Sequence, residues 1–172
     1  MSVEEEIKEH AEHAREPFDK IVAATMAGIA ALLALISVLG QHYTTETIIN
    51  QELASDQWSF YQAKDIRRYI AQSTFDSLAA GRGGDALARK YAEDAGKYRA
   101  QADAVEEKAR DYEKERKRSS EVARRFDFGE VFLEIAIVFS SLAILTKRRP
   151  FFVFGVGSAL AGLVIAVTAY WA

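Results

Sequence analysis

The fold of this chain is decided by residues 81–112, GRGGDALARKYAEDAGKYRAQADAVEEKARDY, where a glycine-rich break precedes a regular apolar pattern. After the break, eight apolar residues recur at spacings of four and three: Leu87, Tyr91, Ala95, Tyr98, Ala102, Val105, Ala109 and Tyr112. This pattern is close to a coiled-coil heptad sustained for more than three repeats. Large aromatic and small residues are mixed along it, which favours close antiparallel packing against a second helix.

The partner helix is expected on the N-terminal side of the glycines. Residues 45–78 contain no Pro or Gly, and they carry an irregular apolar stripe: Ile48, Ile49, Leu53, Phe60, Tyr61, Tyr69, Ile70 and Leu78. Glycine favours helix ends and positive φ, so residues 81–84 end this helix, and Asp85 is a natural N-cap for the next one. The arms are nearly equal, so we predict an extramembrane helical hairpin over residues 44–127, with its turn at 81–84 and a length of ~50–60 Å.

Uncharged segments flank this hairpin. Residues 21–40 contain no Asp, Glu, Lys or Arg, and twenty such residues are enough to cross a hydrocarbon core of roughly 30 Å. Two further apolar runs follow the hairpin. We therefore predict an all-α membrane protein with a charged juxtamembrane helix at 1–19 and transmembrane helices at 20–43, 128–147 and 151–172. A cleaved signal peptide is the alternative for the first span, but the run is long for one and its flank is acidic.

Small residues recur along the first and last spans. Ala24 and Gly28 lie four apart, and the last span contains Gly155, Ala159 and Gly162. Small residues at such spacing let helices approach closely in lipid, so we expect these faces to support oligomerisation. Tyr170 and Trp171 are typical of an aromatic anchor at the membrane interface.

The composition argues against several classes of function. Residues 44–127 hold 16 Lys/Arg and 16 Asp/Glu, and so balanced a hairpin is unsuited to nucleic acid, which needs a net basic surface. The absence of cysteine excludes disulfides, thiolate nucleophiles and cysteine-based metal sites. No catalytic set or nucleotide-binding loop occurs at a convincing spacing, so we expect no enzymatic activity and no cofactor.

The second span contains the polar candidates Glu130, Glu134, Ser140 and Ser141. An ionisable residue inside a span is costly and is a functional candidate by default, which applies most directly to Glu134. In the alternative interpretation Glu134 lies near the interface and reaches water or a polar partner.

Far from this span, His10 and His13 lie three apart among glutamates, an arrangement that could bind a divalent metal. The alternative there is a solvated acidic helix, because a full ligand set is missing.

The charges beside the spans predict an orientation. The basic loop at 147–149 is expected on the cytoplasmic side, and Lys8, Arg15 and Lys20 before the first span agree with this. The N-terminus is then cytoplasmic and the hairpin lies outside, in the periplasm. A basic cluster at 110–125 opposes this orientation, although long loops are translocated largely regardless of charge. The alternative is a cytoplasmic hairpin whose basic base contacts anionic lipid.

Residues 54–64, ASDQWSFYQAK, resemble a family of bacterial membrane proteins catalogued as domain of unknown function 4337. The likeness continues at 135–137, IAI, and at 145–149, LTKRR, and covers essentially the whole chain. The resemblance implies a bacterial membrane protein with a helical loop, for which we expect the inner membrane, and it implies no established activity. Within the first string, Trp58, Phe60 and Tyr61 cannot all face one partner from a single helix, so some must contact the second arm, another chain or a ligand.

Two hypotheses of function follow. The first is a membrane-anchored, homo-oligomeric coiled-coil scaffold that binds an unidentified protein partner, with six candidate contact residues: Trp58, Phe60, Tyr61, Tyr91, Tyr98 and Tyr112. The second is a small oligomeric channel or transport subunit, with Glu130 and Glu134 at the pore, because rings of carboxylates can select cations.

Overall fold

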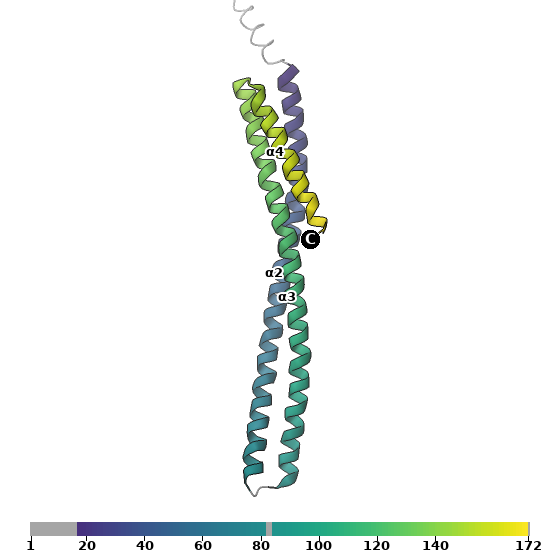
Figure 1. The fold of residues 1–172 in the computed structure, drawn as a ribbon, viewed down its shortest axis with the longest axis vertical. Coiled ribbons are helices and arrows are strands. Elements are labelled where there is room, and N and C mark those ends of the chain that lie inside the picture. The colour runs from purple at the N-terminus through teal and green to yellow at the C-terminus, as the bar shows by residue number, and fades with distance from the viewer. Residues whose placement is uncertain (1–16, 82–83, 172) are drawn as a thin grey trace, which may run out of the picture. The chain divides into compact units, whose positions relative to one another are not determined.

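The computed structural model describes residues 17–81 and 84–171, and its elements are all helices (Figure 1). Three long helices follow one another along the chain: α2 (Pro17–Ala80), α3 (Asp85–Thr146) and α4 (Arg149–Thr168). A single 3₁₀ turn, η1 (Ala169–Trp171), follows α4. The described residues divide into two compact units, a helical bundle that contains residues 17–44 and 120–171 and a hairpin that contains residues 45–81 and 84–119.

Prolines stand at the start of two of these helices. Pro17 is the first residue of α2, and Pro150 lies in the first turn of α4. Proline is tolerated there because the first N–H groups of a helix have no intrahelical acceptor, and its fixed φ already suits the helix. The chain is free of proline between these two positions, which allows α2 and α3 to continue for 64 and 62 residues.

The glycine-rich segment separates α2 from α3 as the sequence predicts, but the capping differs in detail. The Gly81 N–H donates to the Ser77 carbonyl at 3.2 Å, which closes the last turn of α2. The Gly84 carbonyl accepts from the N–H groups of Leu87 and Ala88 at 3.1 and 3.4 Å. Gly84 therefore has the N-cap position that we predicted for Asp85, and Asp85 lies in the first helical turn. A carboxylate there interacts favourably with the helix dipole.

A left-handed residue makes the second reversal of the chain. Among the residues described, Lys147 is the non-glycine residue with positive φ, at 55°, and it directly follows the last residue of α3. This conformation costs roughly 1–2 kcal/mol for a residue with a Cβ. The Lys147 ammonium forms an ion pair with Asp19 in the first turn of α2. Both residues belong to the bundle, and their contact ties the α3–α4 turn to the start of α2.

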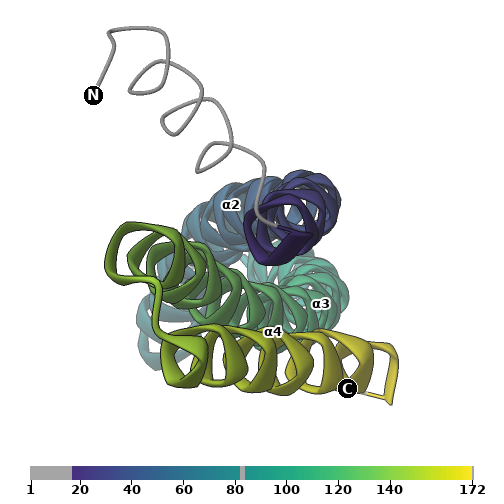
Figure 2. The same cartoon turned by 90° about the horizontal axis from the view of Figure 1, so that it is seen from above.

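The bundle packs α2, α3 and α4 around a narrow apolar core. Figure 2 shows α4 folding back along α3 after the short turn that joins them. The core is made by one buried stripe from each helix: Ile29, Ile36, Val122, Phe126, Leu133, Ala136, Ala159, Ala166 and, from η1, Ala169. Each of the three long helices contains a segment long and apolar enough to cross a membrane, judged by length and composition over the described residues.

The hairpin is formed by the second half of α2 and the first half of α3, which run side by side in opposite directions (Figure 1). Side-chain hydrogen bonds cross between the arms, and among them are those that join Glu46 to Ser119, Trp58 to Glu113 and Lys64 to Gln101. As the residue number rises along the first arm from 46 to 58 to 64, the number of its partner on the second arm falls from 119 to 113 to 101. The two arms therefore pack antiparallel.

Candidate functional site

The second arm of the hairpin contributes a seam of alanines and tyrosines. Alanine occurs there at every seventh residue, and all four alanines are buried: Ala88, Ala95, Ala102 and Ala109. Tyr91 and Tyr98 lie between them and Tyr112 follows the last one; all three tyrosines are half-buried. Because alanine projects only a methyl group, the facing helix can approach closely at each buried position, and the tyrosine rings fill the spaces between. Our prediction started this seam at Leu87, which is exposed; Ala88 has that place.

The first arm meets this seam with a face that its apolar residues do not predict. We call this face the inner seam; its residues are buried or half-buried: Asn50, Ala54, Gln57, Tyr61, Lys64, Arg68, Ala71, Phe75 and Leu78. Most of the expected apolar stripe lies elsewhere, since Ile48, Ile49 and Tyr69 are exposed. Tyr61 and Leu78 of the expected stripe do belong to the inner seam, and polar residues complete it because long polar side chains can cover an alanine-rich partner with their methylene groups.

The string ASDQWSFYQAK holds the register of the hairpin. Ala54 is 2% exposed, and the Trp58 Nε1–H donates to Glu113 Oε1 at 2.9 Å. The Lys64 ammonium donates to Gln101 Oε1 at 2.8 Å. The rings of Trp58 and Tyr61 pack edge to face, 5.5 Å between centroids. These residues come from one helical face, and their polar atoms each need one particular partner on the second arm.

Phe60 is the aromatic residue of this string that the hairpin does not use. Its side chain is 58% exposed, although Trp58 and Tyr61 on either side of it face the second arm. The sequence predicted that the three aromatics could not share one partner, and Phe60 is the one turned away.

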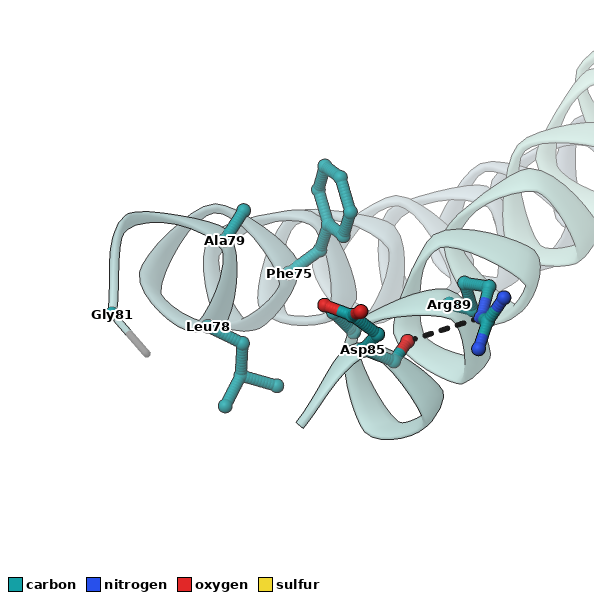
Figure 3. A pocket seen from close by; sticks show the side chains of 7 residues that line it. Phe75, Leu78, Ala79, Gly81, Asp85 and Arg89 are labelled. Atoms are coloured by element: carbon teal, nitrogen blue, oxygen red, sulfur yellow. Dashed lines mark hydrogen bonds between the residues drawn. The ribbon is translucent and has the colours of Figure 1, made fainter. Parts of the chain in front are cut away.

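The tip of the hairpin has a shallow hollow, shown in Figure 3. Phe75 and Leu78 line it from α2, Gly81 lines it just after that helix, and Asp85 and Arg89 line it from α3. The Arg89 Nε–H donates to the Asp85 carbonyl at 3.2 Å, so part of its hydrogen-bonding capacity is used within α3. The hollow combines one carboxylate, one guanidinium and apolar walls, and it has no convergent set of polar groups for a small ligand.

In the bundle, α4 contacts α3 through glycines. A Cβ added to Gly162 would lie 2.7 Å from the Gly129 carbonyl oxygen, and one added to Gly155 would lie 2.9 Å from Ser140 Oγ. The Ser158 hydroxyl donates to the Phe132 carbonyl at 2.7 Å across the same contact. The small-residue face predicted in the last span is thus covered within the chain. Ala24 and Gly28 of α2 remain exposed.

The polar candidates of the second span do not converge within one chain. Ser140 is fully buried against α4, and its hydroxyl has no hydrogen-bond partner among the described residues. Glu134 and Ser141 are exposed on the outside of the bundle, and Glu130 is half-buried. A pore lined by all four side chains is therefore not formed by a single copy.

At the C-terminal end of α4, an arginine and an aromatic cluster hold the bundle together. The Arg125 guanidinium donates to the Thr168 carbonyl at 2.7 Å, where its charge faces the negative end of the α4 dipole. Tyr43 stacks on Phe126 at 5.8 Å, and Tyr170 meets the same ring edge-on at 6.4 Å. Sequence reasoning singled out Tyr170 as an anchor but missed this cluster, because its members lie more than forty residues apart.

No group of three His, Cys, Asp or Glu residues suited to a metal ion occurs within residues 17–81 and 84–171. The predicted metal candidates His10 and His13 lie outside the described residues.

Comparison with known proteins gives one match. A family model described as "Domain of unknown function (DUF4337)" matches residues 18–172, nearly the whole chain. No curated protein and no solved structure matches the chain.

Proposed function

Because the chain belongs to the DUF4337 family, whose description names no activity, we propose its function from its own residues: a membrane-anchored, homo-oligomeric scaffold that binds a protein partner and has no enzymatic activity. The three apolar segments serve as the anchor, and the hairpin serves as the binding element. By the charge pattern, the protein resides in the bacterial inner membrane with its N-terminus in the cytoplasm and its hairpin in the periplasm.

The observation that supports this proposal is the exposed apolar surface of the first arm. Phe60, Ile66 and Ile70 are each more than half exposed, although the polar bonds between the arms are made. When a second surface covers these apolar side chains, it removes them from water, and this burial makes the free energy of association more favourable. Ala24 and Gly28 offer a further uncovered face within the first apolar segment.

The oligomeric state of the full-length protein in mild detergent tests the scaffold proposal. We expect light scattering after size-exclusion chromatography to give a multiple of the chain mass of 19.1 kDa, after the detergent contribution is subtracted. Phe60→Ser should shift the equilibrium towards the monomer, and Ser73→Ala, at an exposed polar position of the same arm, should leave it unchanged. A wild-type protein that is monomeric at every concentration and recovers no partner on cross-linking would contradict the proposal.

The orientation is tested by a single cysteine introduced at Gly84, because the natural chain has none. A periplasmic hairpin predicts labelling by a membrane-impermeant maleimide in intact spheroplasts. Labelling that requires permeabilisation would instead support the cytoplasmic orientation.

One observation favours a second candidate function, an oligomeric ion channel or transport subunit. Glu134 is exposed on the outside of an apolar segment, and a carboxylate there is costly unless it faces water or another copy. Several copies arranged with Glu134 inwards would form a ring of carboxylates able to select cations. The test is cation flux into proteoliposomes, in which Glu134→Ala should reduce the flux and Glu107→Ala, at an exposed position on the hairpin, should not. Absence of flux with the wild-type protein would eliminate this candidate.

A further inference from the structure

The first arm carries a second heptad pattern that its own hairpin leaves uncovered. We call it the outer seam; its eight residues are spaced alternately four and three apart: Ile49, Leu53, Asp56, Phe60, Ala63, Arg67, Ile70 and Thr74. Leu53 and Thr74 are half-buried, and the other six are exposed. Each outer-seam residue directly precedes a residue of the inner seam. At about 100° per residue, the two seams lie about 100° apart around the helix.

The second arm has a matching row on the same side of the hairpin. We call it the facing row; each of its residues directly precedes a residue of the second-arm seam: Lys90, Asp94, Lys97, Gln101, Ala104, Lys108 and Asp111. Antiparallel helices wind in opposite senses when seen from one end, so residues that precede the two seams lie on one side. A shallow groove agrees with this, because Arg67 and Ile70 line it together with Asp94, Tyr91 and Tyr98. The outer seam, the facing row and the tyrosines that this groove leaves open form one surface, which we call the outer face.

The membrane anchor restricts how a second copy can meet the outer face. The helix α2 runs unbroken from Pro17 to Ala80, from the first apolar segment into the first arm. Copies anchored in one membrane with the same orientation therefore hold their first arms parallel and at the same height. Two such hairpins can join their outer faces about a two-fold axis that runs parallel to the arms. Each first arm then lies against the second arm of the other copy, and neighbouring helices are antiparallel, as in many four-helix bundles.

The register of this pairing follows from the hairpin itself. The hydrogen bond from Lys64 to Gln101 shows which residues of the two arms have the same height. The two-fold axis keeps that height, so Ala63, which precedes Lys64, faces Gln101 of the other copy. Counting along the two antiparallel helices from this pair, Phe60 faces Ala104 and Asp56 faces Lys108.

These pairs are complementary in size and in charge. Phe60 is 58% exposed in the single chain, and Ala104 offers it only a methyl group. Asp56 and Lys108 have opposite charges, and neither has an ion-pair partner among the residues that the structure describes. The two-fold axis makes each contact twice.

Arg67 faces the one like charge of this register, Lys97. The Lys97 ammonium is already paired with Glu93 on its own arm at 2.9 Å. Asp94 of the same facing row lies about one turn from Lys97, within reach of a long arginine side chain. The arginine therefore also finds an opposite charge in the other copy.

Pairing of the two first arms with each other is unfavourable in the same membrane. Parallel arms at one height would put each outer-seam residue opposite itself. Asp56 would face Asp56 and Arg67 would face Arg67, and facing like charges are destabilising. We infer that the outer face binds the outer face of a second copy, with the first arm of each against the second arm of the other. The inference rests on the proposed homo-oligomer and names its interface.

Disulfide trapping tests this arrangement, because the natural chain contains no cysteine. In the proposed register, Thr74 faces Lys90 of the other copy. Thr74→Cys and Lys90→Cys chains, carrying tags of different size, are co-expressed, oxidised in isolated membranes and then extracted. We expect the mixed disulfide to be the main product. Thr74→Cys alone should give little dimer, because the two first arms lie diagonally across the bundle, with axes roughly 11–14 Å apart, and a disulfide needs Cα atoms within about 7 Å.

Ala92→Cys is the matched control for Lys90→Cys. Ala92 is exposed, lies close to Lys90 in height and follows the second-arm seam residue Tyr91 instead of preceding it. It therefore lies on the opposite side of the hairpin, and with Thr74→Cys it should form little mixed disulfide. Equal trapping of Lys90→Cys and Ala92→Cys would overturn the outer face as the interface.

Charge reversal gives a second measurement that does not depend on cysteine. Asp56→Lys should raise the dissociation constant of the dimer about 10-fold, because two ion pairs become two repulsions. The double variant Asp56→Lys with Lys108→Asp restores the opposite charges and should recover the wild-type dissociation constant. In a pair of parallel first arms, the single reversal would exchange one repulsion for another, and Lys108→Asp would not rescue it.

These outcomes separate the inference from the proposed function. Thr74–Thr74 disulfides without the mixed product would overturn the face-to-face pairing and leave the oligomeric scaffold intact. An oligomer seen by light scattering, with no disulfide at these sites and no response to charge reversal, would do the same. A monomeric wild-type protein would overturn both.

Discussion

Replacing Gly162 by alanine tests how closely α3 and α4 pack. The new Cβ would lie 2.7 Å from the Gly129 carbonyl oxygen and 2.9 Å from the Phe132 Cβ, whereas ordinary contact begins at 3.4 Å. The closer atom belongs to the backbone, so it cannot rotate away, and the two helices must separate by several tenths of an ångström. Overpacking of this kind costs about 1–3 kcal/mol. Alanine recovers up to about 1 kcal/mol by its helix propensity, so we expect a net loss of ~1–2 kcal/mol.

Gly157→Ala is the matched control. Gly157 lies on the same helix, but a Cβ added there would meet nothing within 4 Å. Only the helix-propensity gain then remains, so this variant should be unchanged or more stable by up to about 1 kcal/mol. The two substitutions are chemically identical, and any difference in stability between them reports the contact alone.

The assay is reversible unfolding in mixed micelles, with the fraction of SDS increased stepwise. Trp58→Phe in every variant leaves Trp171, just after α4, as the single tryptophan and hence as the fluorescence reporter of this unit. Equal unfolding midpoints for Gly162→Ala and Gly157→Ala would refute the close packing of α3 against α4. A lower midpoint for Gly162→Ala alone is the expected result.

Two further predictions concern the hairpin and its base. Ala102→Leu should destabilise the hairpin by about 1–3 kcal/mol in thermal unfolding, because Ala102 is buried at 3% exposure. Ala100→Leu, at an exposed position, should have little effect. Equal melting temperatures of the two variants would contradict the alanine seam. The pKa of Glu121 is lowered by hydrogen bonds from the guanidinium groups of Arg124 and then Arg125. Its stabilising contribution is therefore present above the unfolded pKa of about 4.3 and is lost as the pH falls through the lower folded value. Glu121→Gln should remove that part of the acid sensitivity in a pH titration of helix content, and an unchanged acid transition would show that these bonds do not stabilise the fold.

Local periodicity was enough to predict the helical elements. The apolar segments follow from uninterrupted runs without charge, and the break at 81–84 follows from glycine content. The second-arm seam follows from alanine and tyrosine recurring at heptad spacing, and the buried Ala95, Ala102 and Ala109 occur at predicted positions. Each of these features depends on residues close in sequence, so helix geometry alone translates the pattern into structure.

The face by which the first arm meets the second could not be read from the same pattern. The outer seam is more apolar than the inner seam, so hydrophobicity alone selects the wrong one. The inner seam is selected by specific partners on the other arm: Gln101 pairs with Lys64 of the seam, and Glu113 pairs with Trp58 beside it. Such pairings join residues 37 and 55 positions apart, and no local rule contains them.

The sequence by itself determined that this chain is a set of long helices with three apolar segments and a charged hairpin, because helix type and length depend on residues within a few turns. Only the tertiary structure decided that the glycines of α4 face α3, that Ser140 is enclosed, and that Lys147 has a left-handed conformation and forms an ion pair with Asp19. Small residues permit a close approach to any neighbour. Which neighbour takes that place depends on how the whole chain packs, since only packing brings distant backbone and charged groups into contact.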